Sequence, residues 1–329
     1  ILVTNDIMMR IAAAVCGVEV QEYKNDRIKE SAYMGYREIE TTREIIDGTY
    51  KKQSLDPEIF ADEKPFVPNE YITLTDGSAS ALCVYRDNCI RLLKDMTAFG
   101  IRPQNRLQRF ALDALLAPAE EIPLVILRGP AGTAKTFLSM AAALDKTYTD
   151  EFSRQIGSTS YDKIYIGRAN VSSDEAFGFL PGELEDKTRP LLGCFYSNLE
   201  DLLRKGNHEE DIQIQMQIDD MMETGLLRVF PLAYIRGMSI KNSFIICDEA
   251  QNIGRSLIRD IVTRCGQGSK LVVLGDTNQI DVPFLDKTNS GLTYLAHNMK
   301  GSTKCAQITL TEKESVRSAL ATEALSRLD

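Results

Sequence analysis

The chain has 329 residues, 43% of them hydrophobic, and a formal net charge of -9 at pH 7. This length and hydrophobic content suffice for more than one folded domain, and the acidic balance argues against a uniformly basic nucleic-acid binder. The sequence contains no apolar run long enough to span a membrane, and its seven cysteines form no C-x-x-C pair. We therefore expect a cytoplasmic protein with reduced thiols and no membrane span.

The first residues, "ILVTNDIMMRIAAAVCGVEVQEY", predict a strand followed by a helix, with Asp6 between them. An Asp in this place is an ordinary helix N-cap or one of several carboxylates of a metal site, and taken alone it favours the N-cap. Farther on, segments 36–42, 69–76 and 80–93 alternate like the strands of a small β unit. Residues 53–70 have the composition of a loop.

Residues 103–116, "PQNRLQRFALDALL", predict a basic amphipathic helix. Gln108 within it is a candidate contact for an adenine base, although such a helix more often packs one face on a core and exposes its arginines. Residues 122–128 form a short apolar run, as in a buried parallel strand. A glycine-rich loop follows directly, and residues 135–146 then predict a helix rich in Ala, Leu and Met.

The order strand, glycine loop, helix is the setting in which backbone amides wrap a phosphate, helped by the positive end of the helix. Lys135 would neutralise charge on the β- and γ-phosphates of a nucleotide. The Thr136 hydroxyl would ligate Mg²⁺, which prefers oxygen ligands. The candidate nucleotide-binding residues of the loop are Gly129, Pro130, Ala131, Gly132, Thr133, Ala134, Lys135 and Thr136.

Ala134 departs from the glycine that usually precedes the lysine of such a loop. An added methyl group is costly there only if the position needs a positive φ or if the methyl meets the phosphate. Because the position opens a helix, where alanine is well suited, we expect a working site. A "GTAK" loop is also similar to that of minichromosome-maintenance helicases, which use it productively.

Further apolar runs of strand length follow, separated by helical or loop sequence. They lie within 162–170, 226–235, 242–251, 269–279 and 305–311. Strands that alternate with helices predict an α/β fold with a doubly wound parallel sheet.

Two of these runs end in polar residues. "FIICDEAQ" places Asp248 where it could hold Mg²⁺ and Glu249 where it could polarise a water, and the alternative is an exposed acidic turn. "LVVLG" is followed by Asp276 and Gln279, which could approach the γ-phosphate because strand ends line the ligand crevice of such a sheet. The alternative there is a Gly-Asp turn. Together with the glycine loop that follows residues 122–128, these are three strand-end motifs in the order that a nucleotide site requires. This order favours the functional interpretation.

From about Gly100 to the C-terminus the sequence resembles the PhoH-like ATPase family, relatives of superfamily 1 helicases. The resemblance rests on "NRLQ", "RGPAGTAKT", "GFLPGELEDKTRPLLGCFYSNLE", "YIRGMSIKNSFIICDEAQN", "GDTNQID" and "GLTYLAHNMK". It implies a P-loop NTPase (RecA-like) domain over 99–329 that hydrolyses ATP with Mg²⁺. The roles that it implies are adenine reading for Gln108, the Walker A pair for Lys135 and Thr136, the Walker B pair for Asp248 and Glu249, and γ-phosphate sensing for Gln279.

The start of the chain has a second resemblance, to the last strand and helix of a PIN nuclease domain, in which Asp6 matches one metal-binding carboxylate. By this resemblance 1–24 is a PIN-domain remnant, 25–98 a linker and small β-rich domain, and the whole the C-terminal part of a PIN-PhoH fusion. We expect no ribonuclease activity from this chain alone, because Asp6 cannot build a metal site by itself.

These features favour an ATP-dependent motor that acts on RNA, with the RNA implied by resemblance. The alternatives are an ATPase that drives a protein rearrangement and a nucleotide-binding scaffold with little hydrolysis. Because one motor domain supplies one phosphate loop, a second copy would close the site, and the resemblance implies a hexameric ring. Arg317 is the favoured arginine from the neighbouring copy, with Arg264 and Arg236 in reserve, although each could be a surface ion pair.

Overall fold

A computed structural model describes residues 1–4, 7–21, 28, 33–148, 160–169, 184–204, 211–235 and 237–314. Three residues with expected roles, Asp6, Arg236 and Arg317, lie outside these ranges, as does most of the segment "GFLPGELEDK".

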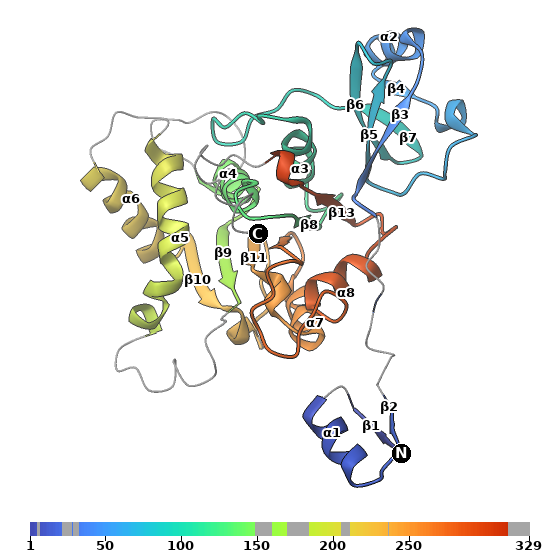
Figure 1. Cartoon of the computed structure of the whole chain (residues 1–329). Helices are drawn as coiled ribbons and strands as arrows, with labels where there is room; N and C mark the ends of the chain where they lie inside the picture. Colours follow the sequence, from blue (N-terminus) through green and yellow to red (C-terminus); the bar gives the residue numbers. More distant parts are fainter. Residues whose placement is uncertain are drawn as a thin grey trace.

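The larger of the sheets has six strands, all parallel, in the order β10-β9-β11-β12-β8-β13 (Figure 1). The strands are β8 (Leu124–Arg128), β9 (Lys163–Arg168), β10 (Leu227–Pro231), β11 (Ser243–Asp248), β12 (Lys270–Gly275) and β13 (Cys305–Thr309). Continuous apolar runs form these strands because a parallel sheet is covered on both faces. The strands expected between 122 and 311 are thus confirmed.

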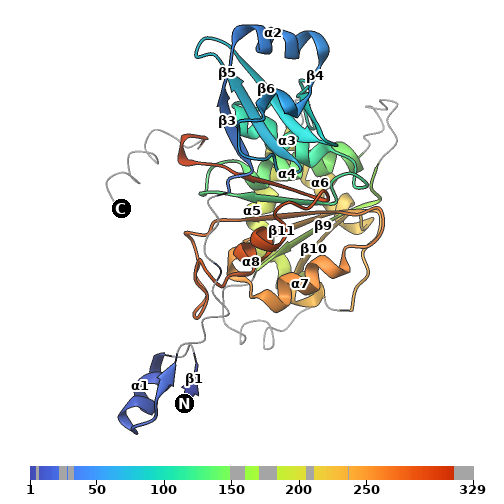
Figure 2. The same cartoon turned by 90° about the vertical axis from the view of Figure 1, so that its right-hand side faces the viewer.

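Helices cover both faces of this sheet (Figure 2). One face carries α3 (Arg106–Leu116), α4 (Lys135–Thr147), α5 (Leu184–Arg204) and α6 (Asp211–Glu223). The other face carries α7 (Arg255–Arg264) and α8 (Gly291–Asn298). Short 3-10 turns lie in the connections: η3 (Leu232–Ile235), η4 (Ala250–Asn252) and η5 (Glu312–Glu314). The expected α/β architecture is confirmed.

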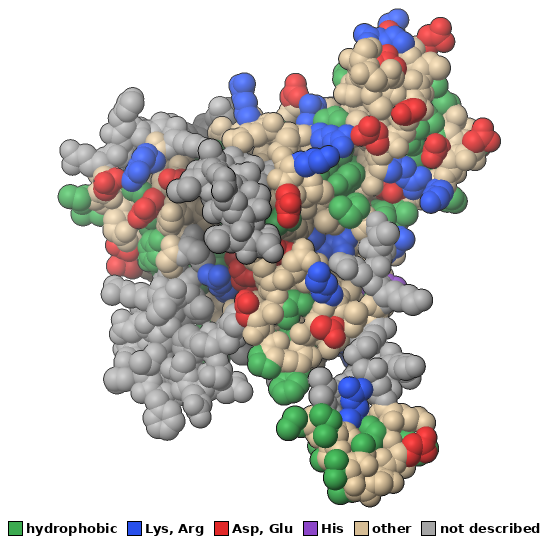
Figure 3. Space-filling view, viewed as in Figure 1, with side chains coloured by type: hydrophobic (Ala, Val, Ile, Leu, Met, Phe, Trp, Pro, Cys, Tyr) green, Lys and Arg blue, Asp and Glu red, His purple; other side chains and the backbone are tan. Residues whose placement is uncertain are grey.

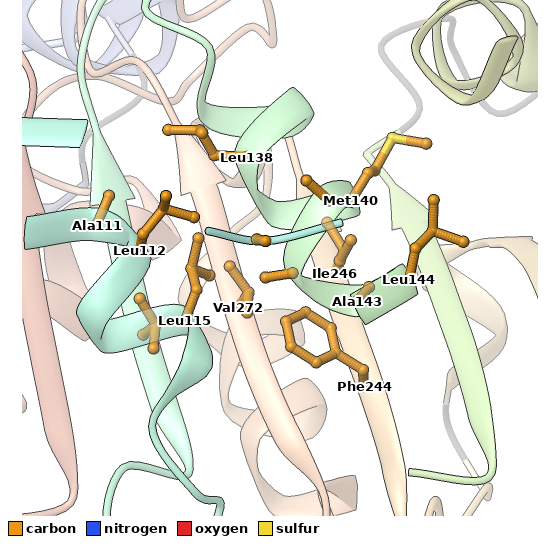
Figure 4. Close-up of a cluster of buried hydrophobic side chains, with 14 of the residues drawn as sticks. Ala111, Leu112, Leu115, Leu138, Met140, Ala143, Leu144, Phe244, Ile246 and Val272 are labelled. Atoms are coloured by element: carbon orange, nitrogen blue, oxygen red, sulfur yellow. The ribbon is translucent and has the colours of Figure 1, made fainter. Parts of the chain in front are cut away.

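The alternation of side chains along each strand builds two separate cores. In β11, Phe244 and Ile246 belong to the core under α3 and α4, whereas Ile245 and Cys247 belong to the core under α7 and α8. Figure 4 shows Phe244 and Ile246 among side chains from α3, α4 and β12. Since both faces of this strand are buried, its carboxyl end is held firmly at the edge of the sheet where Asp248 lies.

A second sheet of five strands, in the order β3-β5-β6-β7-β4, is mostly antiparallel. Its elements are β3 (Tyr36–Glu40), helix α2 (Arg43–Lys52), β4 (Ser54–Leu55), β5 (Glu70–Thr75), β6 (Ser80–Arg86) and β7 (Cys89–Leu92). These strands confirm the small β unit. The segment 53–70, which we expected to be a loop, contains β4 and the 3-10 turn η2 (Pro57–Phe60), because Leu55 and Phe60 are buried in the core of this sheet.

The small sheet packs against helix α3 of the large one. The ring of Tyr71 stacks on Phe110 with a centroid distance of 4.8 Å. The Tyr71 hydroxyl donates to Asp113 Oδ2 over 2.9 Å, and Arg86 Nη2 donates to the same oxygen over 3.0 Å. This contact therefore joins the second sheet to the helix that carries Gln108.

The first residues form a small unit of β1 (Leu2–Val3), α1 (Ile7–Val15) and β2 (Val20–Gln21), with the two strands parallel. A strand followed by a helix was expected here, but these elements do not identify a nuclease domain. In Figure 3 apolar side chains gather on one side of this unit, and Met8, Ile11 and Val15 on α1 are all more than half exposed. Within the described ranges, no helix has the length and apolar character needed to cross a membrane.

Candidate nucleotide site

The carboxyl ends of β8, β11 and β12 meet at one edge of the large sheet, because all its strands run in parallel. At this edge lies a cavity of about 250 Å³. Its described lining consists of Ala131, Gly132, Ala134, Lys135, Thr136, Phe137, Asn198, Asp248, Glu249, Gly275, Asp276 and Gln279. The structure thus brings most of the loop residues, the Asp-Glu pair and Gln279 to one site.

Lys135, the first residue of α4, lies under the loop. Its Nζ donates to the carbonyl oxygens of Gly129 over 2.6 Å and Pro130 over 2.8 Å, and lies 3.4 Å from Thr133 Oγ1. The Thr133 hydroxyl in turn donates to the Pro130 carbonyl. These contacts place an ammonium group and the positive end of a helix in the same loop, which is the electrostatic requirement of a phosphate site.

Gly129 opens the loop in a conformation that other residues rarely adopt, with φ at 141°. A Cβ at this position would approach the Leu310 carbonyl oxygen to 2.5 Å. The loop can therefore leave β8 beside the segment after β13 only because glycine has no side chain.

The expectation that Ala134 opens the helix with helical backbone is wrong. Its φ of 65° and ψ of 21° are left-handed, and the helix begins only at Lys135. An alanine in this region costs roughly 1 kcal/mol because its Cβ crowds the following carbonyl oxygen. The position therefore has the backbone for which glycine is suited, and Ala134 carries strain at the nucleotide site.

Asp248 and Glu249 follow β11 directly. Asp248 is buried, and this burial, followed by the nearby charge of Glu249, raises the pKa of Asp248 to about 6, against the opposing effect of Arg168 and Lys135. Glu249 adopts a left-handed φ of 55°. Asp248 and Thr136 line the same cavity. Oxygen donors of this kind fit Mg²⁺.

Gln251 is a site residue that the sequence reasoning missed. Its Nε2 donates to Glu249 Oε2 over 2.6 Å and to the Gln279 carbonyl over 2.9 Å, while its Oε1 accepts from the Asp276 amide over 3.1 Å. A Cβ on Gly275 would meet Gln251 Oε1 at 2.4 Å, so glycine is needed for this approach. Gln251 therefore connects the loop after β11 to the loop after β12 through hydrogen bonds. Its place in "DEAQ" was a usable signal.

Two more residues were missed. Asn198 of α5 lines the cavity, and Arg168 at the end of β9 forms an ion pair with Glu249, with Nη2 and Oε1 separated by 3.3 Å. Asn198 lies in the segment "GFLPGELEDKTRPLLGCFYSNLE", from which no role for that residue was inferred, and Arg168 belongs to no local motif that predicts its contact with Glu249. Only the pairing of β9 with β11 brings Arg168 opposite Asp248.

Other expected residues lie outside this cavity. Gln108 is buried near the start of α3, where its Oε1 accepts from the Gln104 amide, and the described lining does not include it. Gly129 and Pro130 line a neighbouring cavity of about 470 Å³ instead. Arg264 ends α7, and its carbonyl accepts from the Ile240 amide before β11 starts, so it lies toward the opposite edge of the sheet.

A model of the family described as "PhoH-like protein" matches residues 100–329. The chain belongs to the PhoH-like protein family. Family membership implies nucleotide binding, which agrees with the phosphate-type loop at the edge of the sheet. The resemblance to the PhoH-like family that was inferred from the sequence motifs is thereby confirmed.

Several curated relatives are similar over most of the chain. "Protein PhoH2" of Bacillus subtilis (strain 168) is 36% identical over 331 residues, covering 98% of this chain and 70% of its own length. "Protein PhoH2" of Mycolicibacterium smegmatis is 29% identical and covers 99% and 70%. A "PhoH-like protein" of Mycobacterium tuberculosis is 38% identical over 183 residues, covering 56% and 46%.

Among solved structures, "The structure of PRRSV helicase" matches with a TM-score of 0.25 and 14% identity, covering 75% of this chain and 42% of its own. So weak a likeness carries no argument about fold or activity.

Proposed function

We propose that this chain hydrolyses ATP and couples the hydrolysis to movement on RNA. The observation that supports ATP hydrolysis is the convergence of Lys135, Thr136, Asp248, Glu249 and Gln279 on one cavity at the carboxyl edge of a parallel sheet. This set contains a phosphate-neutralising cation, Mg²⁺ donors, a carboxylate for the attacking water and an amide to sense the γ-phosphate.

Each residue has a distinct part in the proposed reaction. Lys135 exchanges its carbonyl partners for oxygens of the β- and γ-phosphates. Thr136 and Asp248 would hold Mg²⁺, which would neutralise phosphate charge. Glu249 orients a water and accepts its proton. Gln279 lines the same cavity and would contact the γ-phosphate. Its carbonyl oxygen accepts a hydrogen bond from Gln251 Nε2.

The RNA substrate rests on the family resemblance alone. The second resemblance, to a PIN nuclease domain, supports a PIN-domain origin for the unit of β1, α1 and β2 and coupling to a ribonuclease in a longer protein. The two resemblances together support the division of the chain into 1–24, 25–98 and 99–329. The apolar side chains exposed on α1 agree with a helix taken from a larger core.

We further propose that copies of this chain form a ring, a hexamer by resemblance, in which each copy completes its neighbour's site. The described cavity contains Lys135 as its basic residue, and charge that develops on the γ-phosphate needs further cations. Arg317 is the favoured donor from the neighbouring copy, with Arg236 and Arg264 in reserve.

The experiment that tests the proposed function compares steady-state ATP turnover with and without single-stranded RNA at saturating Mg-ATP. An RNA motor turns over ATP faster when RNA is present. Turnover that RNA leaves unchanged supports an ATPase that rearranges proteins. Binding of Mg-ATP without turnover under either condition supports a scaffold and contradicts the proposal.

A further inference from the structure

Arg168 has no assigned part in the reaction described above. It ends β9, and in the sheet it lies directly opposite Asp248 of β11. Its Nη2 is 3.3 Å from Glu249 Oε1. Glu249 is the residue proposed to orient the attacking water, so the guanidinium contacts the reacting carboxylate itself.

Both oxygens of Glu249 are engaged by side chains that stand outside the cavity. Oε1 is paired with Arg168, and Oε2 accepts from Gln251 Nε2 over 2.6 Å. Of the described residues that line the cavity, Glu249 is one but Arg168 and Gln251 are not. The left-handed backbone at Glu249 accompanies this arrangement. A water at the γ-phosphate would therefore have to compete with these protein partners for the carboxylate oxygens.

The two partners differ in what can reach them. Gln251 is fully buried and is fixed by the Gln279 carbonyl and the Asp276 amide. Arg168, by contrast, has a side chain that is 31% exposed. A ligand from outside can therefore compete for Arg168 but not for Gln251.

The chemistry of the guanidinium indicates which ligand competes. Its planar fork of N–H donors matches the oxygens of a phosphate as well as it matches a carboxylate. A nucleic-acid strand presents phosphates at high local density, and these attract arginine strongly. A phosphodiester that binds Arg168 withdraws the partner of Glu249 Oε1.

We propose that Arg168 is a positioning residue that restrains Glu249 until a phosphate of single-stranded RNA binds the guanidinium and frees the carboxylate for the attacking water. This proposal rests on the proposed ATPase function and gives its regulation. The restraint is partial, because an ion pair that is about a third exposed is screened by water. Pairs of this kind correspond to about a two- to five-fold change in an equilibrium.

The test measures steady-state turnover at saturating Mg-ATP, with and without a single-stranded oligouridylate, in the wild type, Arg168→Gln and Arg168→Lys. Arg91→Gln is the matched control, because Arg91 forms an exposed ion pair with Asp87 in the small sheet. Binding of a fluorescent ATP analogue is measured for every variant.

We expect Arg168→Gln to raise turnover without RNA by about two- to five-fold and to lose most of the stimulation by RNA, with ATP-analogue binding unchanged. Arg168→Lys keeps a cation and should retain both the restraint and the RNA response in weaker form. Arg91→Gln should behave as the wild type. A residue with a merely structural role would lower both rates together.

Turnover of Arg168→Gln that stays equal or falls while the RNA stimulation persists overturns the proposal and leaves the ATPase function standing. A wild type that binds Mg-ATP but does not turn it over, with or without RNA, overturns both. If Arg168→Gln fails to fold, the salt dependence of turnover by the wild type tests the restraint instead. Added salt screens the exposed pair, so RNA-free turnover at saturating Mg-ATP must rise with ionic strength, and an unchanged or falling rate contradicts the restraint.

Discussion

Strain at the nucleotide site is concentrated in two residues that are not glycine, Ala134 and Glu249, both with positive φ. Such conformations cost of order 1 kcal/mol or more and persist only where the surroundings enforce them. Ala134 lies directly before Lys135, and Glu249 directly after Asp248. The strain therefore occurs beside the two groups proposed to hold the phosphates and Mg²⁺.

Replacing Ala134 with glycine should stabilise the ligand-free protein. Glycine removes roughly 1 kcal/mol of left-handed strain but adds freedom to the unfolded chain, so the net gain in the free energy of unfolding is about 0.5 kcal/mol. Ala131→Gly in the same loop is the control, because the φ of Ala131 is not positive, and it should lose roughly 0.5 kcal/mol. Urea unfolding of both variants checks this, and equal signs would contradict the strain assigned to Ala134.

Sequence reasoning placed Lys135, Thr136, Asp248 and Gln279 at one edge correctly, because residues at the ends of parallel strands meet there. It could not give the conformation of Ala134, since a loop residue before a helix is compatible with helical or left-handed backbone. It also missed Arg168, whose contact with Glu249 depends on strand order, a tertiary property that no local pattern contains.

Among the elements, β12 and α3 are joined by a buried lysine. Lys270 is fully buried at the start of β12, and its Nζ donates to the Ala114 carbonyl in the last turn of α3 over 2.7 Å. Burial, with a smaller contribution from Arg86, lowers the pKa of Lys270 to about 7. The last turn of α3, the helix that carries Gln108, thus accepts a hydrogen bond from an amino group whose charge changes near neutral pH.

This residue should make stability rise with pH. Above its folded pKa of about 7 Lys270 is neutral in the native protein, whereas in the unfolded chain it stays protonated up to about pH 10. Unfolding therefore binds a proton in this window, and stability increases as pH rises through it. Between about pH 7 and about pH 9 the wild type should gain about 2 kcal/mol relative to Lys270→Met.

Urea unfolding at the two pH values measures this difference. The Lys270→Met variant serves as the reference because it removes the titrating group and keeps an apolar chain of similar length. Parallel pH dependence in the two proteins would show that Lys270 is charged in the native state.

Strands could be predicted from the sequence where their residues are apolar on both faces of the sheet. Strands such as β11 and β12 are buried along their whole length, so their runs are continuous. The two-residue strand β4 is different, because only Leu55 in it is buried and a run this short has no period to detect.

For the whole molecule, the two larger sheets share a core, since Tyr71 and Val84 of the small sheet belong to the cluster that contains Phe110. The polar group of Tyr71, Arg86 and Asp113 holds the same interface. Movement of the small sheet would therefore be transmitted to α3. This contact does not follow from local sequence patterns.

The proposed ring predicts complementation between inactive chains. Lys135→Ala lacks phosphate binding in its own site but keeps its arginine, whereas Arg317→Ala keeps its loop. Mixing the two should restore part of the ATP turnover, because some interfaces then join an intact loop to an intact arginine. Turnover per chain that is independent of concentration, a monomer by light scattering and no recovery on mixing would together contradict the shared site.

The most direct test of the central claim, that this cavity hydrolyses ATP, is the turnover of Glu249→Gln against the wild type, with Mg-ATP binding measured in parallel. We predict unchanged binding and turnover lower by at least ~10²-fold, the scale of losing a general base. Equal turnover by the two proteins would contradict the assignment of the site.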